Sequence, residues 1–567
     1  MLRSSNWMNG DDEVAMSHRV ALRLNSADYG KPIIGIADTS SALNPCNAGF
    51  RTLISDIERG IRVAGGVPAS FPAMSLGEDL MKPSAMLYRN LVSIELEEMV
   101  RANPIDGVVF LANCDKSVPA SLMAAASTDI PSLVLFGGAR SAPLFRGRPL
   151  GSGTDLWHLL DERRAGNVDD NEWSELERSL GCAGPGSCNT MGTASSMAII
   201  TEILGMSLPG ATGTPALSDE LRGFAYETGR RVTQMVAEDI RPSARMNQAA
   251  IDNAIRCLAA VGGSTNAVIH LSAIAGRLDM QAGLERMDSL WRDVPLLVDV
   301  EPCGKRLIFD FKSAGGVPAL ARAMGSLFDG GTITAIGQTW RDVAANASEP
   351  GTVIRALESP LGPAPTMAAI FGSLAPDGAV IKVAAASERL LNHSGRAIVF
   401  EDYLDMRKRL DDETLVVDAT NVIVVRNCGP VGVPGMPEWG MAPIPKRLVE
   451  DGVRDMLRIS DGRMSGTSFG TVVLHIAPES GVGGPLALVE DGDMIQLDLD
   501  ARRIDLLVSE SELAERVARF SNSQVLHERG WPLLYQQHVL QAPQGCDFDF
   551  LVGSGGRSFV EPVVGRS

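Results

Sequence analysis

The sequence predicts an α/β protein in two parts, an N-terminal domain built on a parallel sheet and a β-rich C-terminal domain. The chain has 567 residues, which is too long for one ordinary core. Its first two-thirds alternates strand-like and helix-like segments, a pattern typical of a parallel sheet. Around residue 372 the segments become short, β-rich and separated by Gly, Pro and Asp.

The strands of the first part are predicted from short apolar runs. They lie at residues 32–39 (KPIIGIAD), 106–112 (DGVVFLA) and 131–137 (PSLVLFG). Between them, residues 55–65 and 84–102 carry the apolar spacing of helices.

The second part contains four β-rich runs, at residues 372–387, 395–402, 414–427 and 471–480. Residues 493–510 (DMIQLDLDARRIDLLVSE) show two period-2 runs around a polar turn, which predicts a hairpin. We place the boundary near residue 372, so the predicted domains are 1–372 and 373–567.

Composition and charge exclude some classes of function. The net charge of −18 argues against broad binding to nucleic acid or to an anionic membrane, which needs a basic surface. It does not exclude an anionic small substrate, because a bound cation can dominate the field inside a cleft. We find no secretory signal pattern and no run of 18 apolar residues, so a cytoplasmic protein is expected.

Three of the eight cysteines share a local context. Cys46 follows the first predicted strand, Cys114 follows the second directly, and Cys188 lies in a glycine-rich loop before a helix-like segment. Functional groups gather at such strand ends and helix N-termini, where free N–H groups stabilise thiolates. Three thiolates there would hold a metal or an iron–sulfur cluster. The separations of 68 and 74 positions fit no C-x-x-C rule, so three unrelated buried cysteines remain the alternative.

Charged residues stand in similar loops. Asp115 and Lys116 follow Cys114 on the same turn, where an unused charged pair is costly to bury. Glu78 and Glu438 lie in loops rich in Gly and Pro. Hard oxygen ligands of this kind suit Mg²⁺. The alternatives are a surface ion pair and solvated loop glutamates.

Residues 459–480 (ISDGRMSGTSFGTVVLHIAPES) place polar side chains in a glycine-rich turn before a strong strand. Arg463, Ser465, Thr467 and His475 are candidate site residues; the alternatives are a simple hairpin turn and a core histidine. The abundant glycines complete neither G-x-G-x-x-G nor G-x-x-x-x-G-K-[ST], which disfavours nicotinamide and P-loop enzymes.

Six motifs resemble the dihydroxy-acid and phosphogluconate dehydratases: NPCN, NCDKSVPAS, GSCNTMGTASSM, VGGSTNAVIHL, GPVGVPGMPE and SDGRMSGTSFGTVVLHIAPES. They occur in the family's order between about residues 32 and 550. The resemblance implies an N-terminal α/β domain that carries a cluster and a metal, and a barrel-like C-terminal domain that covers the site. It also implies a homodimer or homotetramer.

The resemblance also implies roles for single residues. Cys46, Cys114 and Cys188 would ligate an iron–sulfur cluster, with 2Fe–2S favoured over 4Fe–4S and one iron open to the substrate. The remaining implied site residues are Glu78, Asp115, carbamylated Lys116 and Glu438 around Mg²⁺, Ser465 as the base, and Thr467 beside it. An unmodified lysine would repel the metal, whereas a carbamate is a carboxylate-like ligand.

The implied reaction removes water from a 2,3-dihydroxy carboxylate and gives a 2-keto-3-deoxy acid. Ser465 takes the C2 proton, Mg²⁺ stabilises the charge that develops, and the open iron draws off the C3 hydroxyl. CNTMGTAS at 188–195, Met464, Thr467 and Leu474 resemble the sugar-acid branch, which favours an aldonate, either a pentonate or a hexonate. Departures from the family pattern occur at Ala120 and at Lys312–Ser313.

Three alternatives remain beside a sugar-acid dehydratase. One is a branched-chain dihydroxy-acid dehydratase. Another, of a different class, is a zinc-dependent hydrolase in which the three thiolates hold Zn²⁺ and a water molecule. The third is a catalytically dead binding protein, which the intact Cys, Asp, Lys, Glu and Ser positions disfavour.

Overall fold

A four-stranded parallel sheet forms the centre of the N-terminal lobe. The computed structural model describes residues 2–9, 13–520 and 526–553. The strands lie in the order β2-β1-β3-β4, and their bounds are β1 Ile33–Asp38, β2 Val67–Pro72, β3 Gly107–Leu111 and β4 Ser132–Leu135. The inner strand β3 is buried along its whole length because helices cover both faces, so its sequence is continuously apolar. The prediction of a parallel α/β sheet is confirmed.

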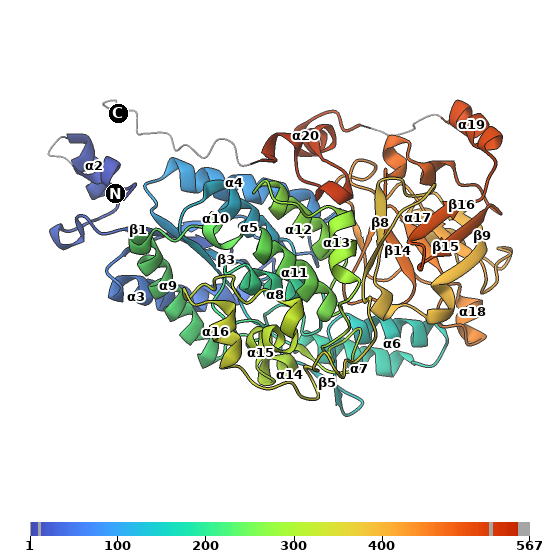
Figure 1. Cartoon of the computed structure of the whole chain (residues 1–567), viewed down its shortest axis with the longest axis horizontal. Helices are drawn as coiled ribbons and strands as arrows, with labels where there is room; N and C mark the ends of the chain where they lie inside the picture. The colour runs from blue at the N-terminus through green and yellow to red at the C-terminus, as the bar shows by residue number, and fades with distance from the viewer. Residues whose placement is uncertain (1, 10–12, 521–525, 554–567) are drawn as a thin grey trace.

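Two helices cover each face of this sheet (Figure 1). On one face, α3 (Ile54–Val63) and α9 (Asp219–Glu238) pack against apolar side chains of β1, β3 and β4. Gly60 and Gly229 let these helices touch, because a Cβ at either position would lie within 2.3 Å of the partner's backbone oxygen. On the other face lie α4 (Arg89–Ala102) and α5 (Ser117–Thr128).

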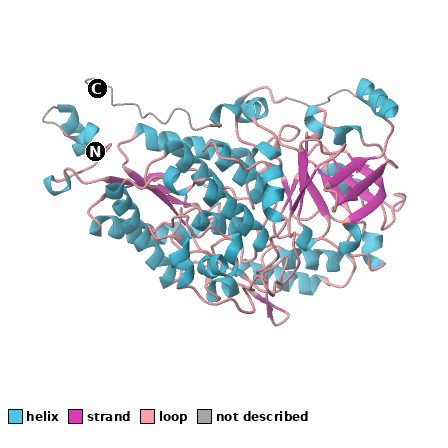
Figure 2. Ribbon diagram, in the orientation of Figure 1, coloured by secondary structure: helices cyan, strands magenta, loops and turns pink. Residues whose placement is uncertain are grey.

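A second set of helices widens the lobe (Figure 2). The buried helices α8 (Thr193–Ile203), α11 (Gln248–Ala260) and α12 (Asn266–Gly276) join the core that contains α4 and α5. The remaining elements of this part are α1 Ser5–Met8, α2 Glu13–Ala21, β5 Leu144–Phe145, β6 Arg148–Pro149, α6 Thr154–Arg164, α7 Asp170–Gly181, α10 Pro242–Arg245, α13 Leu284–Trp291, α14 Ile308–Ser313, α15 Gly316–Ala323 and α16 Trp340–Ala345.

An eight-stranded mixed sheet forms the C-terminal lobe, in the order β16-β15-β9-β10-β12-β14-β8-β7. Its two edges nearly meet, because backbone hydrogen bonds join Phe371, just after β7, to Arg502 and Ile504 beside and within β16. The sheet is therefore barrel-like, as the resemblance implied. The bounds are β7 Ala368–Ile370, β8 Gly378–Ile381, β9 Asn392–Phe400, β10 Val422–Val425, β12 Arg458–Ser460, β14 Val472–Ala477, β15 Met494–Asp498 and β16 Arg503–Leu506.

The predicted hairpin at 493–510 is confirmed by the antiparallel pair β15–β16. The run at 414–427 is only partly a strand: residues 414–417 form none, and the side chain of Val416 is 88% exposed. The apolar composition of residues 414–417 predicted β-structure that does not form, because a turn closed by Asp412 and Thr414 holds this segment at the surface. A domain boundary near residue 372 stays a prediction.

The last described segment crosses back over both lobes. Trp531 at the start of α20 (Gly530–His538) donates to Leu87 O in the N-terminal lobe, and Gln536 donates to Val431 O in the C-terminal lobe. The other elements of this part are α17 Tyr403–Arg409, β11 Glu438–Trp439, α18 Lys446–Glu450, β13 Arg463–Met464 and α19 Glu510–Arg519. No helix in the described ranges is long and apolar enough to cross a membrane.

Candidate active site

A cavity of about 350 Å³ lies where the two lobes meet. Side chains from both lobes line it, and most of the site residues expected from the sequence are among them. They are Cys46, Glu78, Cys114, Asp115, Cys188, Glu438, Ser465 and Thr467. The cavity therefore brings together residues that lie up to 421 positions apart in the chain, from Cys46 to Thr467.

The three cysteines reach the cavity from separate loops. Neighbouring parallel strands β1 and β3 end at the same edge of the sheet, so the loops after them carry Cys46 and Cys114 to one place. Asn113 fixes this arrangement, because its Nδ2 donates to Cys46 O at 2.8 Å and to Gly138 O at 2.9 Å. Cys188 arrives from the loop before α8. All three are free thiols.

Electrostatics around the sulfurs favour one thiolate in particular. A hydrogen bond from Cys114 lowers the pKa of Cys46. Burial raises the pKa of Cys188 to about 12, so this sulfur needs a positive charge beside it to ionise. Arg140 supplies such a charge to two of the sulfurs: it acts against burial on the pKa of Cys188, and its Nη2 lies 3.9 Å from Cys46 Sγ. Its Nε donates to Gly186 O. Sequence reasoning missed Arg140, although it stands just after the strand-like run 131–137.

The three carboxylates form a second group in the cavity. One oxygen each from Glu78, Asp115 and Glu438 lies within 4.8 Å of the others, a spacing that could hold a metal ion. Lys116 lies behind them with no solvent exposure; its Nζ contacts Asp115 and lies 3.3 Å from Glu438 Oε2 and 3.5 Å from Glu78 Oε2. Lys116 thus belongs to this group but does not line the cavity itself.

Burial and charge act in opposite directions on these groups. Burial opposes ionisation of Asp115, but the adjacent Lys116 ammonium outweighs it and lowers the pKa of Asp115. Burial dominates at Glu78, and its pKa is raised. For Lys116, burial alone would lower the pKa, yet the three carboxylates together raise it. The unmodified lysine is therefore held as an ammonium ion.

Two further donors hold the same Glu438 oxygen that Lys116 contacts. Arg463 Nη1 donates to Glu438 Oε2 at 2.5 Å, and Asn266 Nδ2 donates to the same oxygen at 3.0 Å. Arg463 is fully buried and reaches Ser84 as well, whose hydroxyl donates to Glu78 at 3.2 Å. Asn266 was not singled out from the sequence, although it lies within the motif VGGSTNAVIHL. Arg463 thus fixes Glu438 directly and Glu78 through Ser84.

Ser465 and Thr467 form a hydroxyl pair on the loop after β13. Their side-chain oxygens lie 2.8 Å apart, and the Thr467 backbone N–H points to Ser465 Oγ at 3.3 Å. His475 lies elsewhere: it is 2% exposed within β14 and does not line the cavity. Burial lowers the pKa of His475 to about 3, so it stays neutral near pH 7. The core-histidine interpretation describes its position.

Several positions noted from the sequence lie outside the cavity lining. Lys312 on α14 donates to Gly210 O and pairs with Glu220 at 2.8 Å, and neither Lys312 nor Ser313 lines the cavity. Met464 and Leu474 are buried away from the lining as well. Of the positions that distinguish the sugar-acid branch outside 188–195, Thr467 alone meets the cavity.

The fold and the site together define a two-lobed protein whose thiol and carboxylate groups face one cavity between the lobes. Two family models match the chain: the dihydroxy-acid/6-phosphogluconate dehydratase N-terminal domain over residues 31–343 and the corresponding C-terminal domain over 352–546. The chain belongs to the dihydroxy-acid/6-phosphogluconate dehydratase family and is a dehydratase, that is, a hydro-lyase.

Relatives named for several different substrates align along nearly the whole chain. L-arabinonate dehydratase of Rhizobium leguminosarum bv. trifolii is 44% identical over 564 residues, covering 98% of this chain and 97% of the relative. The 6-deoxy-6-sulfo-D-gluconate dehydratase of Pseudomonas putida is 43% identical over 571 residues, covering 99% and 98%. Dihydroxy-acid dehydratase of Methanothermobacter thermautotrophicus is 36% identical over 533 residues, covering 92% and 95%.

Proposed function

We propose that this dehydratase acts on a sugar acid, an aldonate of the pentonate or hexonate class, and converts it to the 2-keto-3-deoxy acid. The observation that carries the proposal is a single cavity lined by three free thiols, three carboxylates and the Ser465–Thr467 pair. Identity to the two relatives named for L-arabinonate and 6-deoxy-6-sulfo-D-gluconate, 44% and 43%, exceeds the 36% to the dihydroxy-acid dehydratase, which supports an aldonate over a branched-chain substrate.

The thiol group fits an iron–sulfur cluster. Three cysteines from three loops line one cavity, which the carboxylates and the Ser465–Thr467 pair line as well. Thiolate ligands of this number leave a fourth position open. The 2Fe–2S type is preferred on the resemblance of residues 188–195 to the sugar-acid branch.

The carboxylate group fits Mg²⁺. Glu78 Oε2 is buried, accepts no hydrogen bond in the described part of the chain and has the Lys116 ammonium 3.5 Å away, so it becomes available as a metal ligand once that ammonium is modified. Three carboxylates against the Lys116 and Arg463 cations leave a net charge near −1, whereas carbamylation of Lys116 would make it near −3. The more negative site suits a hard divalent cation better. When bound, the cluster and Mg²⁺ would supply Lewis acidity toward the C3 hydroxyl and toward the substrate carboxylate and C2 hydroxyl.

The chain's own residues handle the proton. Ser465 takes the proton from C2, and the electron pair of that C–H bond forms the C2–C3 double bond as the C3–O bond breaks. The C3 hydroxyl leaves as hydroxide and takes up the proton that Ser465 removed from C2, so that water departs and Ser465 returns to its ionised form. The resulting enol tautomerises to the 2-keto acid. A free serine is a poor base, so Ser465 depends on donors around its oxygen, which Thr467 provides through its N–H and its hydroxyl.

Activity measurements on a panel of stereochemically defined pentonates and hexonates test the proposal, with dihydroxyisovalerate assayed beside them. We expect a 2-keto product from at least one aldonate and much slower turnover of dihydroxyisovalerate. The Ser465→Ala variant should lower kcat by about 1,000-fold while the visible absorption of the cluster stays, and Ser174→Ala on the exposed face of α7 serves as the control.

Two outcomes would contradict the proposal. Turnover of dihydroxyisovalerate alone would assign the branched-chain activity instead. Zinc without sulfide in elemental analysis, with hydrolysis and no 2-keto product, would assign the zinc-dependent hydrolase. We further propose that the partners are the small-molecule substrate and other copies of this chain in a homodimer or homotetramer, with no nucleic acid and no membrane, and that the enzyme acts in the cytoplasm.

A further inference from the structure

We propose that Trp157 is a positioning residue that orients the Thr467 hydroxyl toward Ser465. The inference rests on the proposed function, in which Ser465 acts as the base. Trp157 lies on α6, far from Ser465 in the sequence, and lines the same cavity. Trp157 lies in none of the six motifs and is not among the site residues expected from the sequence.

A chain of two hydrogen bonds joins the three side chains. Trp157 Nε1 lies 2.9 Å from Thr467 Oγ1, and Thr467 Oγ1 lies 2.8 Å from Ser465 Oγ. An indole N–H only donates, so Thr467 Oγ1 accepts from Trp157. The direction of the first bond is therefore fixed by chemistry.

This fixed direction constrains the proton of Thr467. The hydroxyl proton cannot point toward Trp157, because the indole N–H occupies that side of the oxygen. Of the remaining directions, one leads to Ser465 Oγ. Accepting a bond from Trp157 also polarises the Thr467 O–H, which makes it a better donor. Ser465 Oγ, once ionised, then receives the Thr467 hydroxyl as well as the Thr467 backbone N–H. Donors set in place beforehand stabilise the charged form without reorganisation.

Close packing holds the indole in place. A Cβ on Gly440 would lie 2.3 Å from Trp157 Cη2, so the absence of a side chain there makes room for the ring. Gly440 follows β11, the short strand that carries Glu438, and the Trp439 carbonyl of that strand accepts from Ser465 N at 2.7 Å. Residues 438–440, which carry the Glu438 carboxylate, therefore also contact the Trp157 ring and the backbone of Ser465.

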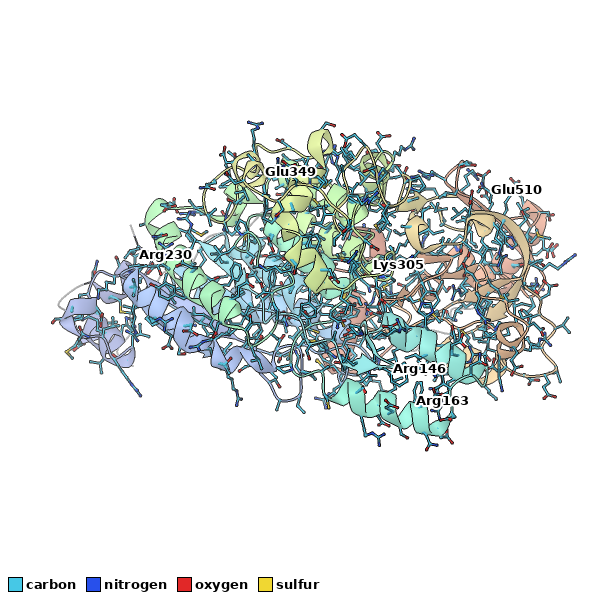
Figure 3. The ribbon with its side chains drawn as sticks, turned by 90° about the horizontal axis from the view of Figure 1, so that it is seen from below. Arg146, Arg163, Arg230, Lys305, Glu349 and Glu510 are labelled. Carbon is cyan, nitrogen blue, oxygen red and sulfur yellow. The ribbon has the colours of Figure 1, made fainter. Side chains whose placement is uncertain are left out.

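Helix α6 contacts the Ser465 loop at two further points. Thr154 Oγ1 donates to Thr467 O at 2.9 Å, and the His158 ring stacks on Phe469 with centroids 3.9 Å apart. Gly153, just before α6, has φ +86° and leaves no space for a Cβ, which would lie 2.3 Å from Thr467 Oγ1. Figure 3 shows the two helices near the labelled Arg146 and Arg163, α6 and α7, at the edge of the molecule beside the C-terminal lobe. The base is thus ordered by a helix of the other part of the chain.

The Trp157→Phe variant of the cluster-loaded enzyme tests the inference, because it removes the N–H and keeps an aromatic ring. With the aldonate turned over by the wild type, we expect kcat to fall about tenfold, KM to change less than about twofold, and the acidic limb of the kcat–pH profile to move about one unit toward higher pH. The visible absorption per protein should stay unchanged. Trp173→Phe on α7, where the ring stacks with Arg163, is the matched control and should leave kcat and the pH profile unaltered.

A double-mutant comparison separates positioning from general packing. In a Thr467→Val background, Trp157→Phe should have no further effect, since the hydroxyl through which it acts is gone, whereas Thr467→Ser should retain the wild-type response. The inference is overturned if Trp157→Phe lowers kcat equally in the wild-type and the Thr467→Val backgrounds, or if its pH profile is identical to that of the wild type. Either result leaves the proposed function intact. A wild-type enzyme that converts no aldonate overturns both.

Discussion

Lys116 Nζ lies 3.3 Å from Glu438 Oε2, although 322 positions of the chain separate the two residues. Lys116 is fully buried, and Glu78 and Asp115 complete a ring of three carboxylates around its ammonium. The ammonium of unmodified Lys116 therefore neutralises carboxylate charge that a divalent cation would need for binding. Binding of Mg²⁺ and conversion of this amine to an anion are expected to go together.

Replacing Lys116 by Met distinguishes the two states of the lysine. If Lys116 acts as a carbamate ligand, Lys116→Met should weaken Mg²⁺ binding at least tenfold, because an anionic ligand is lost. If it stays an ammonium, the same change removes a repelling charge and should strengthen binding. Titration of Mg²⁺ by calorimetry with and without bicarbonate measures the direction, and tighter binding in the variant would refute the carbamate.

Serine in place of each cavity cysteine should abolish the cluster. Cys46→Ser, Cys114→Ser and Cys188→Ser each remove a soft ligand, and we expect loss of the visible absorption and at least a 100-fold fall in activity. Cys182→Ser is the matched control, because this thiol is exposed at the end of α7 and does not line the cavity. Full absorption and turnover in any of the three variants would remove that cysteine from the ligand set.

Glu301 gives a pH dependence whose sign can be worked out. Burial and the neighbouring Asp155 raise the pKa of Glu301 to about 7, and its buried Oε2 has no hydrogen-bond partner among the described residues. The unfolded chain releases this proton near pH 4.5 and the folded protein near pH 7. The stabilisation is therefore present below about pH 4.5 and is lost as the pH rises to about 7.

The Glu301→Gln variant keeps the shape of the protonated side chain and removes its titration. Relative to this variant, the wild type should lose about 1–2 kcal/mol of stability between pH 4.5 and 7.5, after allowance for solvent screening of a partly exposed group. Thermal unfolding midpoints of both proteins across this range measure the difference. A constant gap between them would show that Glu301 titrates normally.

Asp547 ties the last described segment to the N-terminal lobe. Its carboxylate pairs with Arg277 at 2.8 and 3.0 Å, and both side chains are buried. Asp547→Asn removes the two-pronged counterion of buried Arg277 and leaves only the longer pair with Glu97 at 3.7 Å, so it should destabilise the protein by about 3 kcal/mol. Urea unfolding measures this.

Glu172→Gln provides the exposed comparison for the Asp547 variant. Glu172 pairs with Arg146 at 2.5 Å. The side chain of Arg146, which is labelled in Figure 3, is 47% exposed. Solvent screens such a pair, so the effect should stay within about 1 kcal/mol. Equal effects of the two variants would mean that the buried pair adds nothing special.

Local pattern was sufficient for β1, β3 and β4 of the first sheet and for the hairpin at 493–510, because burial on both faces or on one face leaves a continuous or alternating apolar pattern. It missed the edge strand β2 (Val67–Pro72), most of which is only partly buried or exposed. It failed at residues 414–417, where an apolar run lies exposed beside a turn. Asn266 could have been found from its motif, and Arg140 from its place after a strand. Trp157 carries no signal in the sequence, since only the packing of α6 on the Ser465 loop gives it a partner.

The sequence by itself determined which kinds of side chain stand at the ends of strands and in glycine-rich loops, because strand periodicity and turn chemistry are local properties. The tertiary structure decided which of them share a cavity. Cys46 and Cys114 meet because β1 and β3 pair in register, and Glu438 meets Lys116 because the second lobe closes over the first. Such contacts depend on the pairing of distant segments, which no separation along the chain encodes.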